Sequence, residues 1–145
     1  MYIKELTCND YDGETYTTTL YFNLNEAELI DLEIDRGPKG IEGYLDKIQT
    51  AKDKGEAIRF VKEIIRKSYG IKSEDGRRFI KTDQIWEEFS QTAVYPALFS
   101  LLMTSEVELE AFMRGVVPKN VRQQMPVRKD ASVAATKEIM IDPRQ

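Results

Sequence analysis

Apolar residues recur at helical spacing through the second half of the chain. Over residues 82–118 they are separated by three and four positions, a pattern typical of amphipathic helices that share a core. These positions are Ile85, Phe89, Leu98, Phe99, Leu102, Leu109, Phe112 and Val116. Pro96 interrupts the pattern and predicts either a kink or the first turn of a separate helix. This stretch is therefore predicted to form the centre of the hydrophobic core.

The amino-terminal segment has a two-residue period instead. Residues 2–8 and 15–24 are rich in Tyr, Thr, Ile and Leu, and they flank the turn-forming residues 9–13. Every second residue from Leu20 to Leu24 is apolar, so one face of the second arm can pack inward while the other stays in water. The segment is predicted to be a β-hairpin that lies on the helices, because an isolated hairpin is marginally stable in water.

Start and stop signals divide the remainder into short helices. Asn25 with Glu28 predicts a capped helix over 25–34, which the Gly and Pro residues of 37–40 end. Further helices are predicted from 41 to about 54, from 56 to 68, from 82 or 83 onward, and from 104 or 105 to about 115. A loop or miniature hairpin is predicted between the third and fourth helices. The third helix is predicted to bury Ile58, Val61, Ile64 and Ile65, with Phe60 widening that face.

These elements predict an α+β fold that is predominantly helical. A β-hairpin precedes a bundle of about five to six short helices within a single domain over residues 1–118, and residues 119–145 are predicted to be a flexible tail. The chain has 145 residues and is 41% hydrophobic, which is enough for one modest core.

The cysteine and histidine counts limit which disulfides, catalytic bases and metal sites the chain can form. Cys8 is the single cysteine and there is no histidine, so an intramolecular disulfide is excluded and the commonest general base and metal ligand is missing. The sequence has no apolar run near the roughly 18 residues of a membrane span and no signal peptide at its start. These features predict a soluble protein of a reducing cytoplasm that makes no membrane contact.

Charge is distributed unevenly around the net value of −4. Residues 1–118 carry 15 Lys or Arg against 22 Asp or Glu, whereas residues 119–145 carry six against three. The body is therefore acidic and the tail mildly basic. An acidic body makes nucleic-acid binding an unfavoured interpretation, because phosphate contacts need a clustered positive face.

Three motifs superficially suggest chemistry. Residues 37–40 contain two glycines and a lysine but lack the spacing and preceding strand of a phosphate-binding loop. Asp10 and Asp12 lack the closing glutamate of a calcium loop, and turn chemistry accounts for them. Glu87 and Glu88 are adjacent on a predicted helix and point in different directions. The sequence thus predicts a non-enzymatic protein without cofactor or metal.

Aromatic residues form the remaining constellation and are concentrated in the second half of the chain. Base stacking on nucleic acid would require nearby cations, and the local cluster is Arg77, Arg78 and Lys81 beside acidic residues. Core packing or a protein interface is the better account. A small nucleic-acid-binding regulatory protein that uses Arg77, Arg78 and the basic tail stays as the alternative.

Several linked segments resemble the tail assembly chaperones of long-tailed bacteriophages. They read TLYFNLNEAEL over 19–29, SYGIKSEDGRRFIK over 68–81, EFSQTAVYPALF over 88–99 and AFMRGVVP over 111–118. The order Tyr-Gly, Asp-Gly, Phe-x-Lys, Glu-Phe, Ala-x-Tyr, Phe and Gly-x-x-Pro is what carries the resemblance. Together these segments span nearly the whole body.

The resemblance implies a non-enzymatic chaperone in the cytoplasm of the bacterial host. Such a protein binds the long tape measure protein, keeps it soluble until tail tube subunits replace it, and tends to form a homo-oligomer. In many phages a ribosomal frameshift also produces a longer form whose added domain recruits the tail tube protein. This chain would correspond to the short form.

A chaperone for an apolar helical client needs adaptable apolar surface, and seven residues are predicted to supply partner contacts. The methionines suit such a surface because flexible thioethers repack against varied sequences, and the threonines lie on a predicted strand edge. The seven are Tyr95, Phe99, Met103, Phe112, Met113, Thr17 and Thr19.

Overall fold

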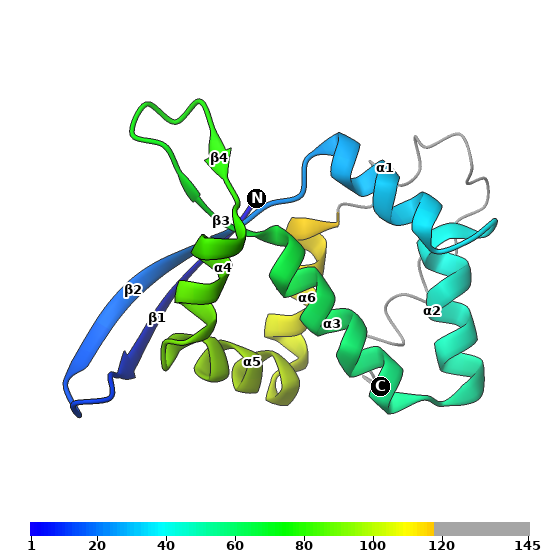
Figure 1. The fold of residues 1–145 in the computed structure, drawn as a ribbon. Helices are drawn as coiled ribbons and strands as arrows, with labels where there is room; N and C mark the ends of the chain where they lie inside the picture. The colour runs from blue at the N-terminus through cyan, green and yellow to red at the C-terminus, as the bar shows by residue number, and fades with distance from the viewer. Residues whose placement is uncertain (118–145) are drawn as a thin grey trace.

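The computed structural model describes residues 1–117, and it shows an antiparallel sheet with six helices (Figure 1). The predicted boundary at 118 and the predicted tail over 119–145 lie outside the described residues. The elements are β1 (Tyr2–Asn9), β2 (Thr15–Phe22), α1 (Glu26–Asp35), α2 (Gly40–Ala51), α3 (Lys54–Ser68), β3 (Tyr69–Lys72), β4 (Phe79–Ile80), α4 (Asp83–Ser90), α5 (Val94–Thr104) and α6 (Glu106–Val116). The predicted α+β, mainly helical fold is confirmed.

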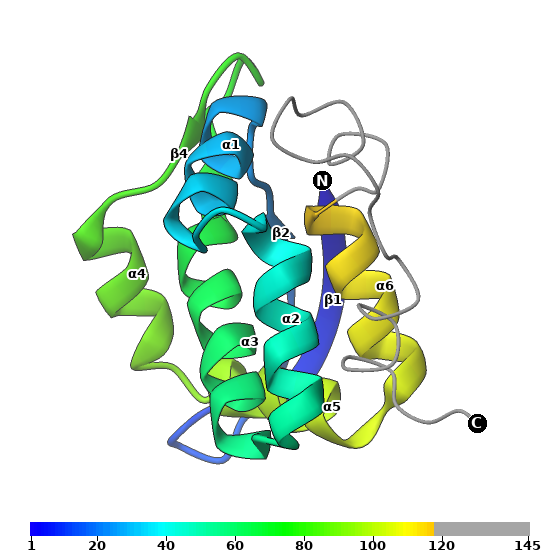
Figure 2. The same ribbon diagram turned by 90° about the vertical axis from the view of Figure 1, so that its right-hand side faces the viewer.

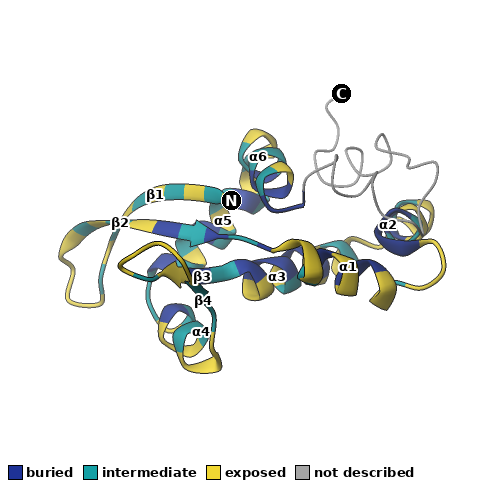
Figure 3. Cartoon of the chain, turned by 90° about the horizontal axis from the view of Figure 1, so that it is seen from above, coloured by how far each residue is buried: buried dark blue, intermediate teal, exposed yellow. Residues whose placement is uncertain are grey.

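The amino-terminal hairpin has the predicted alternation of buried and exposed residues. β1 and β2 pair from Tyr2 opposite Phe22 to Asn9 opposite Thr15. Leu20 and Phe22 are buried, and the residues between and beside them are more exposed, which Figure 3 shows as alternating colours along both strands. The inner face contacts α5 and α6, so the helices supply the packing that an isolated hairpin lacks.

Between α3 and α4, where a loop or a miniature hairpin is predicted, the structure has a hairpin that extends the sheet. β3 pairs with the last two residues of β2, placing Tyr21 opposite Gly70 and Phe22 opposite Tyr69, and β4 then pairs with β3. The strand order is β1-β2-β3-β4. Because β3 covers only that end of β2, one backbone edge of β2 over residues 15–20 has no partner strand within the described part of the chain.

Side-chain caps begin three of the six described helices at positions that the sequence predicts. Asn25 and Glu28 form a reciprocal capping box at α1, and Thr82 and Ser105 cap α4 and α6. α2 ends at Ala51, earlier than predicted, because Lys52 adopts a left-handed conformation with φ of 55°.

Residues from both halves of the chain build one core. Phe22, Ile64, Ile65, Leu98 and Phe112 are fully buried there. The predicted burial of Ile58 is wrong, since 39% of its surface is exposed. The buried stripe of α3 is centred on Val61 and Ile64, and Ile58 lies at its edge near the start of the helix.

Candidate partner-binding site

Ring contacts run without interruption from the core to the surface of the molecule. Tyr2 and Phe112 meet edge-on at 5.3 Å between centroids, Tyr69 and Phe89 stack at 4.0 Å and 13°, and Tyr95 reaches Phe99 at 6.5 Å. In order, the connected rings belong to Phe112, Tyr2, Phe22, Tyr69, Phe89, Trp86, Tyr95 and Phe99. The series couples the position of α4 and α5 to that of the sheet.

The close approach of the β3 and β4 backbones at Gly70 positions the rings that lead from the core to the surface. A Cβ atom at Gly70 would lie 2.6 Å from Cε2 of Phe79 and 2.8 Å from the carbonyl oxygen of Ile80, so only glycine permits the approach. Directly after Ile80, the ammonium group of Lys81 donates to the carbonyl oxygens of Asn23 at 3.0 Å and Lys67 at 2.9 Å. These contacts fix the chain just ahead of α4.

The surface end of the series is a face built from three helices. We define the aromatic face as Lys62 and Arg66 of α3, Trp86 of α4, and Tyr95 and Phe99 of α5. The three rings are each partly exposed. Nζ of Lys62 lies 5.1 Å from the ring centroid of Phe99, and the guanidinium carbon of Arg66 lies 5.5 Å from that of Trp86. The face therefore combines exposed aromatic surface with positive charge.

Two of the predicted contact residues meet on this face, and a third lies beside it. Tyr95, Phe99 and Met103 repeat every four residues along α5 and are each partly exposed, so they share one side of the helix. Burial raises the pKa of the Tyr95 hydroxyl. These three positions stay predictions of partner contact, with surface available to make it.

Phe112 and Met113 were predicted with them, but the structure places both inside. Phe112 is 0% exposed and Met113 is 7% exposed, and both belong to the core. The helical pattern places both on one stripe of α6 with Leu109 and Val116, and such a stripe can face either the core or a partner. Neither side chain offers surface to a partner in this conformation, so we leave them out of the proposed contact site.

Thr17 and Thr19 lie elsewhere, on the exposed face of the hairpin. Thr17 pairs with Thr7 across the hairpin, with their hydroxyl oxygens 2.7 Å apart, and Thr19 lies opposite Glu5. Both belong to the part of β2 whose outer backbone edge β3 does not cover. Their role at a strand edge stays a prediction, and they do not belong to the aromatic face.

Sequence reasoning missed three members of the aromatic face. The sequence pattern marks none of Trp86, Lys62 and Arg66 as a contact residue. A signal existed, since Lys62 and Arg66 are four residues apart on α3 and therefore share one side of that helix. What sequence alone could not show is that α4 and α5 bring aromatic rings beneath them.

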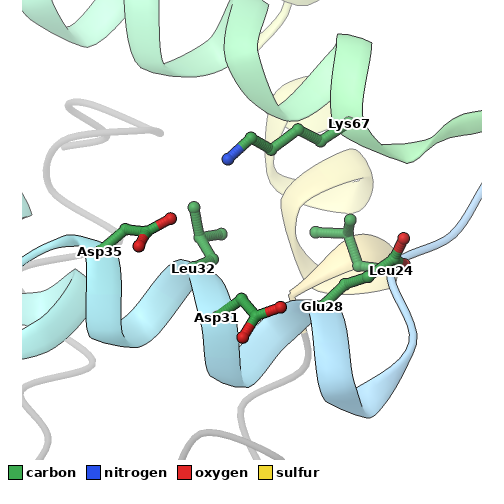
Figure 4. A pocket seen from close by; sticks show the side chains of 6 residues that line it. All are labelled: Leu24, Glu28, Asp31, Leu32, Asp35 and Lys67. Carbon is green, nitrogen blue, oxygen red and sulfur yellow. The ribbon is translucent and has the colours of Figure 1, made fainter. Parts of the chain in front are cut away.

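A groove of about 300 Å³ between α1 and α3 is a second candidate site (Figure 4). Leu24 and Leu32 form its apolar floor, and charged side chains surround them. Glu28 pairs with Lys81 at 2.7 Å, and Lys67 pairs with Glu63 on its own helix at 3.1 Å. Asp31 and Asp35 complete the lining. Residues 1–117 contain no group of three His, Cys, Asp or Glu side chains suited to a metal ion, and we assign this groove no chemistry.

The positions considered for metal or nucleic acid are occupied by turns. The carboxylate of Asp10 accepts the backbone N–H groups of Asp12 and Glu14, each at 2.9 Å. Arg77 and Arg78 are exposed in the β3–β4 turn. There the hydroxyl of Ser73 and then the N–H of Arg77 lower the pKa of Asp75. The predicted nucleic-acid alternative gains no support from this arrangement.

The face offers surface for a partner, and comparison with known proteins gives the family of the chain. A family model described as phage tail assembly chaperone matches residues 1–142. The chain therefore belongs to the phage tail assembly chaperone family, as its sequence motifs predicted. Neither a curated protein nor a solved structure matches it. Membership of a chaperone family argues for a binding role rather than a catalytic one.

Several motif residues that carry the family resemblance meet at one place in the fold. Tyr69 and Phe89 stack, Gly70 admits Phe79, and Lys81 holds the neighbouring backbone. These residues therefore position the aromatic face rather than form it.

Within residues 1–117 no helix has the length and apolarity needed to cross a membrane.

Proposed function

We propose that this chain binds the tape measure protein of its phage and keeps that protein soluble in the host cytoplasm while the tail tube assembles. The aromatic face is the observation that carries the proposal. It exposes three aromatic rings side by side on a chain of the tail assembly chaperone family. Partly exposed aromatic rings beside cationic side chains suit a partner-binding surface, because aromatic residues and Arg are enriched in protein interfaces.

The chemistry of the face suits an apolar helical client. A helix laid on it would bury its apolar side chains against Trp86, Tyr95 and Phe99, which is the common way in which an amphipathic helix is recognised. Met103, one turn further along α5, adds a side chain that adapts to varied sequence. Lys62 and Arg66 would contact acidic residues at the margin of such a helix while their aliphatic stems cover the rings.

Two further partners follow from the family and complete the proposal. Thr17 and Thr19 lie on a partly unpaired strand edge, which is available for a neighbouring subunit in a homo-oligomer. A longer form of the protein, made by frameshifting near the end of the gene, would recruit the tail tube protein to the same client.

Co-expression with the tape measure protein tests the function directly. The tape measure protein alone should be found in the insoluble fraction, and the wild-type chain should bring it into the soluble fraction and co-purify with it. The Phe99→Ala chain should recover less of it. A Tyr11→Ala chain is the matched control, because Tyr11 is 79% exposed at the hairpin turn, away from the aromatic face. A tape measure protein that stays insoluble and unbound beside the wild-type chain would refute the proposal.

A further inference from the structure

Helix α1 is apolar on two opposite sides, although a surface helix ordinarily needs only one apolar side. Leu29 and Leu32 face the core. On the other side Ala27, Ile30 and Ile34 form a stripe at spacings of three and four, and Ile30 and Ile34 are 40% and 60% exposed. We call these three residues the α1 stripe. Exposed branched side chains in one line mark a surface that a partner covers.

Acidic residues border the α1 stripe on both sides. At 100° per residue, Glu26 lies along one margin of the stripe, and Asp31 with Asp35 lies along the other. All three are exposed, and none of them forms an ion pair with another described residue. Helix α1 has no basic residue in its last turn, and Asp35 lies at the negative end of the helix dipole beside the C-cap residue Arg36, whose guanidinium pairs with Glu63. A partner with positive charge beside apolar surface would relieve this.

The aromatic face has the complementary character. Its rings are apolar and partly exposed, and Lys62 above Phe99 forms no ion pair with any described residue, whereas Arg66 makes a loose contact of 3.7 Å with the exposed Asp83. An apolar helix with acidic margins therefore matches, in polarity and in charge, an apolar face that carries Lys62 and Arg66.

The two surfaces cannot meet within one chain. Helix α1 lies at the top of the molecule and α5 at the bottom in both Figure 1 and Figure 2, with α3 between them. We propose that the α1 stripe of one copy packs on the aromatic face of a second copy. Because the two patches differ, the contact is heterologous and repeats from copy to copy, which generates a ring or an open filament.

This contact would also regulate client binding. If the client uses the aromatic face, a point that rests on the proposed function, then a neighbouring α1 and the client compete for one surface. The α1 stripe would cover the rings when no client is present, and a client helix would displace it. Self-association and client loading are then mutually exclusive at each face.

Sedimentation velocity of the full chain without client tests the contact. The wild type should form species that grow beyond a dimer with concentration or close into a discrete ring. Ile34→Lys, which alters the stripe, and Lys62→Glu, which reverses charge on the face, should each lower the association constant about tenfold or more. Ile3→Lys is the matched control, because Ile3 is 56% exposed on β1 and belongs to neither surface; it should associate as the wild type does.

Mixing the two variants gives a result that only a heterologous contact predicts. The Ile34→Lys chain keeps an intact aromatic face and the Lys62→Glu chain keeps an intact stripe, so this contact should join the chains of an equimolar mixture into one-to-one pairs and should extend no further. A monomeric wild type, a dimer that does not grow, or variants that associate like the wild type would overturn the contact. Since no client is present, these results are independent of the co-expression test.

Adding a tape measure segment to the wild type should dissociate the assembly, and an assembly that persists with client bound would overturn the competition.

Discussion

Nζ of Lys81 lies 2.7 Å from a carboxylate oxygen of Glu28, although 53 residues separate them in sequence. The same ammonium group donates to the carbonyl oxygens of Asn23 and Lys67. Glu28 in turn accepts the backbone N–H of Asn25 in the cap of α1. One lysine therefore connects the start of α1, the end of α3 and the segment that leads into α4.

Replacing this lysine should loosen the junction. Lys81→Met keeps most of the aliphatic stem but leaves two backbone carbonyl groups without their donor, so we expect a loss of about 2 kcal/mol in the free energy of unfolding. The ion pair itself contributes a smaller part, because 36% of the Glu28 side chain is exposed. Urea denaturation of the variant measures the loss. Glu28→Gln should cost less, and an equal cost would show that the carbonyl contacts are unimportant.

The close approach of the two strands at Gly70 predicts that one added methyl group lowers the free energy of unfolding substantially. Gly70→Ala places Cβ against the ring of Phe79 and the backbone of Ile80, and we expect a loss of about 2 kcal/mol or more from overpacking. Gly55→Ala is the matched control within α3, where the nearest atom to the added Cβ lies 3.7 Å away. That change should stabilise the chain by up to about 1 kcal/mol through helix propensity. A Gly70→Ala chain as stable as the wild type would contradict the observed close approach.

The hydroxyl of Tyr44 makes stability depend on pH in the alkaline range. Burial, and then its hydrogen bond to Glu56, raise the pKa of Tyr44 from 10.0 to about 12. Because the folded-state pKa is the higher one, the contribution is fully present below about pH 10 and is lost as the pH rises to about 12. The urea midpoint should therefore fall across this interval, and Tyr44→Phe should reduce the fall. An unchanged pH dependence in Tyr44→Phe would contradict this assignment.

The same hydrogen bond acts on its acceptor. The hydroxyl of Tyr44 is the largest cause that lowers the pKa of Glu56, and the side chain of Arg59 is the next. Tyr44→Phe should raise that pKa toward its ordinary value, measured by an NMR titration of the Glu56 carboxyl carbon. Arg59→Gln should raise it as well, because that change removes both a hydrogen bond and an attractive charge. A Glu56 pKa that is unchanged in Tyr44→Phe would contradict this assignment.

Local signals made most of the fold predictable from the sequence. The alternation through Leu20 and Phe22 gave the hairpin its inner face, and the caps at Asn25 and Ser105 marked helix starts, because such signals depend on a few neighbouring residues. The addition of β3 to β2 was not predictable in this way. It depends on the close approach at Gly70 and on Lys81, whose partners are distant in sequence.

The candidate site was less predictable than the fold for a related reason. The helical period places both Phe99 and Phe112 on apolar helix faces, yet Phe99 is partly exposed and Phe112 is fully buried. Which side of a helix is covered depends on how the helices pack on one another, and the pattern of one helix does not contain that information. Lys62 was not predictable as a member of the site either, because its place above the Phe99 ring depends on how α3 lies against α5.

Trp86 provides the most direct measurement of the central claim, that the aromatic face binds the client. It is the only tryptophan in the chain and forms part of that face, so titration with a tryptophan-free segment of the tape measure protein should change its fluorescence and yield a dissociation constant. We predict that Phe99→Ala weakens this binding about thirtyfold and that Tyr11→Ala leaves it unchanged. Binding that leaves Trp86 emission unaltered, or that is equally tight in both variants, would contradict the account.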